Sequence, residues 1–214
     1  MADYPTTDEE QVEVIKKWWA ENGRYLIAGV VLGLAGLFGW NYWQDYTKDR
    51  AMQGSTVFAQ LQQSIQKKDV TAANDALKLL REKYAATPYA EMGSLAIAGF
   101  SATQGDLAAA EENLRWAMEK AKLPEARDVA RLRLAAVLNA GKKYQQALDL
   151  LEQEALPAVY TSLVEEYRGD ALRGLGKLSE ARAAYSRALL TAGGRAEYLQ
   201  WKHDDLGIAG EGAS

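Results

Sequence analysis

The feature that most constrains this chain is a 20-residue segment near its N-terminus that carries no charged side chain. The segment covers residues 25–44 and reads YLIAGVVLGLAGLFGWNYWQ. As a helix, about 20 residues span about 30 Å, which is the thickness of the hydrocarbon core of a bilayer. Aromatic residues of the kind found at membrane interfaces lie before the segment or near its two ends: Trp18, Trp19, Tyr25, Trp40, Tyr42 and Trp43. The segment therefore predicts a single transmembrane helix.

Two other interpretations of this segment are less favourable. A buried helix of a soluble core rarely extends this far without a charge. A cleaved signal peptide would need a shorter N-terminal region and a cleavage site with small residues, but 24 residues precede the apolar core and YTKDR follows at 46–50. We therefore expect an uncleaved anchor.

The basic residues near the anchor favour one orientation by a small margin. Three lie close before it (Lys16, Lys17 and Arg24) and two close after it (Lys48 and Arg50). Because positive charge is enriched on the cytosolic side of membrane helices, this count favours a cytosolic N-terminus. We expect a cytosolic tail at 1–24, a transmembrane helix at 25–44 and an external domain at 45–214.

Two further features belong to the N-terminal part. Gly29 and Gly33 stand in G-x-x-x-G spacing, and with Gly36 they would let another transmembrane helix approach closely, although glycine is also common in membrane helices without such contacts. Residues 7–22 predict a short amphipathic helix that begins with a capping box at Thr7 and ends at Asn22-Gly23. That helix would lie at the membrane surface, dock on a membrane protein partner or simply extend the anchor, and its acidic residues favour a protein partner over the lipid surface.

The rest of the chain contains a repeated sequence pattern. Setting Lys68, Gly105, Lys142 and Gly176 as position zero aligns four segments at intervals of 37, 37 and 34 residues. Position +2 is then Val70, Leu107, Tyr144 and Leu178; position +5 is Ala73, Ala110, Ala147 and Ala181; position +9 is Leu77, Leu114, Leu151 and Tyr185. Pro88, Pro124 and Pro157 recur 36 and 33 residues apart, where a proline can begin the next helix.

A repeat of about 34 residues that consists of helix, turn and helix is the tetratricopeptide pattern. Glu154 departs from it, because Leu80, Ala117 and Ala188 occupy the same +12 position in the other copies. We therefore expect an all-α fold: one transmembrane helix, then a degenerate tetratricopeptide-like solenoid of about four helix pairs with a capping helix. The expected pairs are 48–67 and 70–86, 88–103 and 106–122, 125–140 and 143–155, and 158–174 and 177–192, with the capping helix at 195–206.

The composition argues against catalysis. The chain has no cysteine and one histidine, so thiolate zinc sites, cysteine nucleophiles and most histidine-based triads are impossible. A formal net charge of −4 provides no basic excess for nucleic acid. His203 is expected at a solvated helix end, and the consecutive acids Glu165-Glu166 point to different sides of a helix and do not converge on one site. We expect no enzyme, no cofactor and no metal.

Solenoids of this type usually bind extended segments on the concave face that the first helices of the pairs form. Six residues of the predicted first helices are candidates for that face, although each could equally pack between pairs: Tyr89, Phe100, Arg131, Tyr160, Glu165 and Tyr167.

The N-terminal residues also resemble a known family. Gln11-Val12-Glu13, Trp18-Trp19, Asn22-Gly23, Gly39-Trp40 and Tyr42-Trp43 are similar to the start of the YfgM family, the ancillary subunits of the SecYEG translocon of Gram-negative bacteria. The resemblance covers the whole chain, including the length of the repeat body.

The resemblance implies an inner-membrane protein with a cytosolic N-terminus and a periplasmic repeat domain. It also implies association with the SecYEG translocon, with a membrane-anchored periplasmic chaperone of the PpiD type and with exported clients. We therefore expect an adaptor that links the translocon to chaperones by protein binding. The alternative is a structural scaffold that organises an envelope assembly or division complex and binds no client.

Overall fold

The computed structural model describes the backbone of residues 8–211 and the side chains of residues 11–206. Within that range all regular structure is helical, which confirms the expected all-α class. The α-helices are α1 (Asp8–Gln66), α2 (Val70–Lys83), α3 (Tyr89–Thr103), α4 (Leu107–Lys120), α5 (Pro124–Ala140), α6 (Tyr144–Glu152), α7 (Thr161–Gly174), α8 (Leu178–Leu189) and α9 (Ala196–Glu211). Two short 3-10 helices, η1 (Ala158–Tyr160) and η2 (Gly193–Arg195), precede α7 and α9.

The chain divides into two compact units on either side of Met52, and α1 contributes to both. The first unit contains the apolar segment. Within the described residues, α1 is the one helix long and apolar enough to cross a membrane, and none of its apolar stretch is buried by the rest of the chain. Large apolar surface of this extent calls for a lipid or protein environment.

The expected helix stop at Asn22-Gly23 is wrong, because α1 continues through both residues. The Asn22 side-chain amide donates to the Trp18 carbonyl, one turn earlier, at 3.1 Å. The Trp19 ring lies over Gly23, so close that an added Cβ would meet it at 3.1 Å. A glycine in a helix costs only about 1 kcal/mol, which these local contacts offset. The expected capping residue Thr7 lies outside the described residues.

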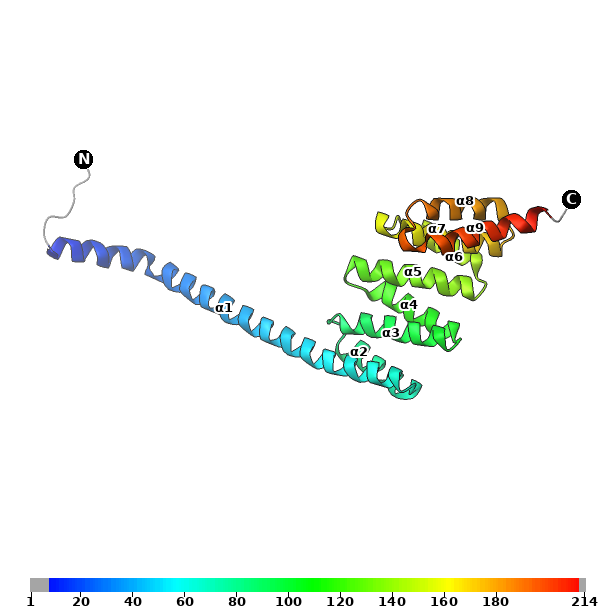
Figure 1. Cartoon of the computed structure of the whole chain (residues 1–214). Helices are drawn as coiled ribbons and strands as arrows, with labels where there is room; N and C mark the ends of the chain where they lie inside the picture. Colours follow the sequence, from blue (N-terminus) through cyan, green and yellow to red (C-terminus); the bar gives the residue numbers. More distant parts are fainter. Residues whose placement is uncertain (1–7, 212–214) are drawn as a thin grey trace, which may run out of the picture. The chain divides into compact units, whose positions relative to one another are not determined.

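The second unit is a stack of helix pairs, which Figure 1 shows in chain order from α2 to α9. The end of α1 packs against α2 through a shared buried cluster that includes Leu61 and Leu77. The next pairs are α3 with α4, α5 with α6, and α7 with α8, while α9 packs on α8 as the capping helix. The expected pairs are confirmed, with one exception at their start: the helix expected to begin at residue 48 is the C-terminal part of the continuous helix α1. The other helix ends differ by up to three residues, and the capping helix continues beyond residue 206 to Glu211. Pro124 begins α5, and Pro88 and Pro157 directly precede α3 and η1.

The turn between the helices of each pair has the same geometry in all four copies. The residues at position zero, Lys68, Gly105, Lys142 and Gly176, have φ values of 57°, 81°, 59° and 76° and are therefore left-handed. In each turn, the next amide donates to the carbonyl five residues earlier at 2.8–2.9 Å, as in a Schellman motif: Asp69 to Ser64, Asp106 to Ser101, Lys143 to Leu138, and Lys177 to Leu172.

The alanines at position +5 lie where the two helices of a pair cross. All four have no exposed surface. The +9 side chains are also buried, and they form two apolar clusters, one around Leu61 and Leu77 and the other around Leu134 and Tyr185. A small side chain at the crossing lets the helices approach, and the larger residue one turn later fills the space between neighbouring pairs.

Glycine in the left-handed turn avoids the strain that a side chain creates there. We predict that Gly176→Ala lowers the stability of the repeat unit by about 1 kcal/mol, or about 2–4 °C in the melting temperature, because the backbone is left-handed and no neighbouring atom is close. Lys142→Gly should have the opposite sign. Thermal unfolding of the detergent-solubilised chain, followed by circular dichroism at the helix band, measures both.

Gly99→Ala is the matched control for this prediction. Gly99 lies inside α3 with open space around its Cα, so the same substitution should stabilise the helix by about 0.5–1 kcal/mol. Equal melting temperatures for Gly176→Ala and Gly99→Ala would contradict the assignment of the turn.

Candidate protein-binding site

The first helices of the pairs, α1, α3, α5 and α7, form one side of the stack, where α5 contacts both α3 and α7. A groove of 510 Å³ lies on this side between α1, α3 and α5. Ile65, Leu95 and Phe100 supply its apolar surface, and Gln66 and Arg133 supply polar groups. Arg133 is exposed and has no ion-pair partner among the described side chains. The groove can accept an apolar segment that carries hydrogen-bonding groups.

Helical periodicity explains why α3 lines this groove. Ala90, Ile97 and Ala98 point into the repeat unit and are buried, whereas Leu95 and Phe100 lie on the two borders of the outer face, about 140° apart around the helix, and are only partly covered. One helix therefore contributes to the core with one face and to the groove with the opposite face.

The six predicted first-helix residues do not come together in one site. Phe100 lines the groove, while Tyr89 packs against Phe58 with ring centroids 5.8 Å apart. Tyr160 and Tyr167 pack against the larger apolar cluster, and burial raises the pKa of the Tyr167 hydroxyl. The remaining two, Arg131 and Glu165, are buried in ion pairs.

Arg131 explains the departure at Glu154. The Arg131 side chain is only 5% exposed and forms ion pairs with Asp128 and Glu154. Its Nη1 donates to the Glu154 backbone carbonyl at 2.7 Å. Because α6 ends at Glu152, Glu154 lies in the following segment, outside the helix in which the repeat pattern places it. The unusual residue thus ties this segment to α5.

Glu165 and Glu166 point to different partners, as the helical spacing predicts. Glu165 accepts hydrogen bonds from Arg168 at 2.6 Å and from Arg187 of α8 at 2.8 Å. Glu166, which is 3% exposed, pairs with Arg195 at the end of η2 and with Lys202 of α9. Each acid therefore connects α7 to a different neighbouring element.

Lys202 joins a buried polar network that the repeat pattern does not reveal. Its Nζ lies 2.9 Å from Glu166 Oε1 and 2.7 Å from Asp170 Oδ1, and Asp170 also accepts the Tyr185 hydroxyl at 2.7 Å. Although burial favours the neutral amine, the hydrogen bonds that the Lys202 ammonium donates to Asp170 and Glu166 raise the pKa of Lys202 to about 12. The charged amine holds α9 on the stack. The sequence predicts only that Lys202 lies on the capping helix and does not predict this contact.

The Tyr185 ring at the +9 position needs a close neighbour without a side chain. A Cβ on Gly169 of α7 would lie 2.5 Å from the ring, so α7 and α8 can approach only because residue 169 is glycine. His203, next in sequence to Lys202, has its Nδ1 2.9 Å from the carboxylate of the neighbouring Asp204. Among the described residues, no group of acids and histidine is arranged to hold a metal ion.

The three glycines predicted to contact another transmembrane helix face open space. An added Cβ on Gly29, Gly33 or Gly36 would meet no atom within 4 Å. The helix surface at these glycines is therefore accessible to another molecule. Their contact with a second transmembrane helix stays a prediction.

Comparison with known proteins gives one family and a consistent set of relatives. A family model described as "Tetratricopeptide repeat-like domain" matches residues 16–208. A protein of Haemophilus influenzae named "Ancillary SecYEG translocon subunit" is 28% identical over 190 residues, which cover 86% of this chain and 93% of the relative. Proteins with the same name from Escherichia coli and Neisseria gonorrhoeae are 27% and 28% identical, and each match covers at least 93% of both chains.

No solved structure matches the chain. The matches to the curated relatives confirm the resemblance that the N-terminal residues indicated. The family match begins at residue 16, so it includes the apolar segment as well as the repeats.

The buried network around Lys202 leads to a prediction about how the stability of the repeat unit depends on pH. Lys202→Met should lower the stability of the repeat unit by about 3 kcal/mol, because Glu166 and Asp170 lose a cation that they share. The folded pKa of Lys202 is raised from 10.5, so its stabilising contribution is fully present below pH 10.5 and is lost as the pH rises through about 12. The difference in melting temperature between the parent chain and the variant should therefore shrink over that range.

Lys120→Met is the control, since Lys120 pairs with Glu119 on the exposed surface and should contribute little. A Lys202→Met variant as stable as Lys120→Met at pH 8 would show that the network does not hold α9.

Proposed function

The chain belongs to the tetratricopeptide repeat-like family, and from this premise we propose that it is a membrane-anchored adaptor that associates with the SecYEG translocon. Its role is protein binding and not catalysis. The observation that carries the proposal is the extent of the matches. Relatives named as translocon subunits align with 86–94% of this chain, so the anchor and the repeats are inherited together.

The proposed topology follows from the anchor. Residues 1–24 lie in the cytosol, 25–44 cross the inner membrane and 45–214 form the periplasmic repeat domain. The count of basic residues on either side of the apolar segment supports this orientation. Gly29, Gly33 and Gly36 are the proposed contact with another transmembrane helix, because their open surface allows close approach.

The repeat domain supplies the binding surface. The groove around Ile65, Leu95 and Phe100 offers apolar surface with polar groups at hand, which suits an extended polypeptide. We assign this groove to a membrane-anchored periplasmic chaperone of the PpiD type or to exported clients. Attachment to the membrane beside the translocon raises the local concentration of the domain, so weak contacts are sufficient.

A photo-crosslinking experiment tests the adaptor. Phe100 is replaced by p-benzoylphenylalanine, which preserves an aromatic side chain in the groove, and cells that are actively secreting are irradiated. We expect SecY to co-purify with the detergent-solubilised chain without irradiation. We also expect irradiation to give adducts with exported chains or with the chaperone.

The same crosslinker at Leu190 is the control, because this side chain is 83% exposed and lies outside the groove. Absence of SecY from the purified material would contradict association with the translocon. Presence of SecY without any client or chaperone adduct at position 100 would instead favour the scaffold alternative.

Orientation can be tested separately because the chain contains no cysteine. Single cysteines are introduced by Glu13→Cys in the tail and Asp75→Cys in the repeat domain, at exposed positions. In intact spheroplasts, a membrane-impermeant maleimide should label the cysteine at position 75, and label the one at position 13 only after permeabilisation. The reverse pattern would place the repeats in the cytosol and exclude a periplasmic function.

A further inference from the structure

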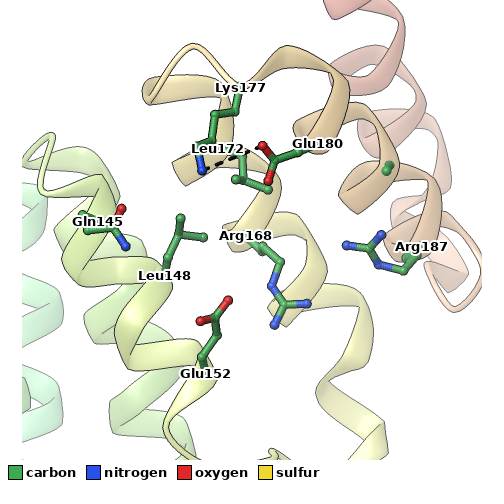
Figure 2. Close-up of a pocket in the computed structure, with 9 residues that line it drawn as sticks. Gln145, Leu148, Glu152, Arg168, Leu172, Lys177, Glu180 and Arg187 are labelled. Carbon is green, nitrogen blue, oxygen red and sulfur yellow. Dashed lines mark ion pairs between the residues drawn. The ribbon is translucent and has the colours of Figure 1, made fainter.

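A second groove, also of 510 Å³, lies on a different part of the stack between α6, α7 and α8 (Figure 2). It shares no residue with the groove around Phe100. Leu148 and Glu152 come from α6, Arg168 and Leu172 from α7, and Arg187 from α8. Figure 2 shows the guanidinium groups of Arg168 and Arg187 and the Glu152 carboxylate directed into this groove.

One edge of the Arg168 guanidinium group lacks a partner. Nη1 donates to Glu165 at 2.6 Å, whereas Nε is buried and has no hydrogen-bond partner. Nη2 has no partner among the described residues either. Nε and Nη2 together form the edge with which arginine binds a carboxylate through two parallel hydrogen bonds. A buried donor without a partner is uncommon and costs free energy, so this edge points to a ligand.

A third groove lies between α2 and α4 and contains Arg81. In Arg81 the same edge of the guanidinium group is hydrogen-bonded within the fold. Arg81 Nε and Nη2 both donate to Ser94 Oγ, at 3.1 and 3.0 Å, and Nη2 donates to Asn113 at 2.7 Å. The Arg81 guanidinium also lies 4.2 Å from the centre of the Trp116 ring. Arg81 is therefore occupied by structural contacts, and Arg168 is not.

The surroundings of Arg168 restrict what the ligand can be. Arg187 adds a second cation, although its Nε and Nη2 hold Glu165. Leu148 and Leu172, which are 7% and 6% exposed, line the groove and provide a small apolar surface there. Glu152 has no ion-pair partner among the described side chains, so it repels a second negative charge. A single carboxylate next to an apolar side chain fits these conditions, and a run of acidic residues does not.

We propose that the groove between α6, α7 and α8 binds a segment of a partner protein in which one Asp or Glu stands between apolar residues, its carboxylate accepting from Nε and Nη2 of Arg168. The inference rests on the proposed protein-binding role but assigns a second surface to it. The apolar neighbours of the acidic residue pack on Leu148 and Leu172.

A peptide-binding experiment tests this inference on the detergent-solubilised chain. The probe is a fluorescein-labelled peptide with Leu-Asp-Leu between Gly-Ser spacers, and the comparison peptide carries Leu-Asn-Leu. Fluorescence anisotropy should show binding of the Asp peptide about tenfold tighter than that of the Asn peptide. Arg168→Lys keeps the positive charge but loses the two-pronged edge, so it should remove most of this preference.

Glu152→Gln provides a variant of opposite sign, which keeps the test valid if Arg168→Lys disturbs the fold. It should bind the Asp peptide about two- to threefold more tightly, because a like charge is removed from the groove. Phe100→Ser should leave binding of the peptide unchanged, since Phe100 lines only the other groove.

Equal affinities for the Asp and Asn peptides would overturn the inference. It would also be overturned if inorganic phosphate, at constant ionic strength, displaced the Asp peptide as effectively as an excess of unlabelled peptide, since the site would then bind small anions. If the peptide does not bind but SecY still co-purifies, only the proposal of this second binding surface is rejected. If the peptide binds but SecY does not co-purify, the assignment of the groove stands and the proposed association with the translocon is rejected.

Discussion

The repeat unit depends on the close crossing of the two helices in each pair. The crossing requires an alanine at +5, which is fully buried in all four copies, and a left-handed turn residue that reverses the chain within a few residues. A larger side chain at +5 would separate the helices and open the apolar clusters that the +9 residues fill. In the last pair, Gly169 has a similar role, because the Tyr185 ring occupies the space of its missing side chain. The grooves exist because this close packing fixes which stripes of each helix remain outside.

The same architecture yields surfaces of different chemistry. On the side of the first helices, the outer face of α3 carries Leu95 and Phe100 on its two borders, so the groove there combines apolar surface with polar groups. Between α6 and α8, polar side chains dominate, and the charged groups are set by the pairing of Glu165 with Arg168 and Arg187. Among the described residues, the last helix pair is followed by the single helix α9, which packs on α8. There the network around Lys202 and Glu166 attaches α9, and electrostatic contacts complement the limited apolar contact around Leu199 and Leu206.

The periodic features of the sequence predicted the helix pairs well, because turn and packing requirements recur at the same positions. All four residues that align as position zero are left-handed, including Lys68 and Lys142, which are not glycine. Local signals did less well where a neighbouring residue offset them. Asn22-Gly23 has the composition of a helix stop, but contacts with Trp18 and Trp19 keep the helix continuous. Glu154 breaks the pattern because it lies beyond α6 and binds Arg131, a contact between residues 23 positions apart that no periodicity reveals.

The sequence by itself determined the class of the protein: an uncharged, aromatic-flanked segment and an alanine-rich repeat leave few alternatives to an anchored helical solenoid. Those properties depend on local composition and spacing, which are readable along the chain. The tertiary structure alone decided which candidates are available for binding. Arg131 and Glu165 look like surface residues of first helices but are consumed by ion pairs, whereas Phe100 remains in a groove and Arg168 keeps one edge free. The difference arises because ion pairs and grooves depend on side chains brought together from different helices, and sequence spacing does not specify those distances.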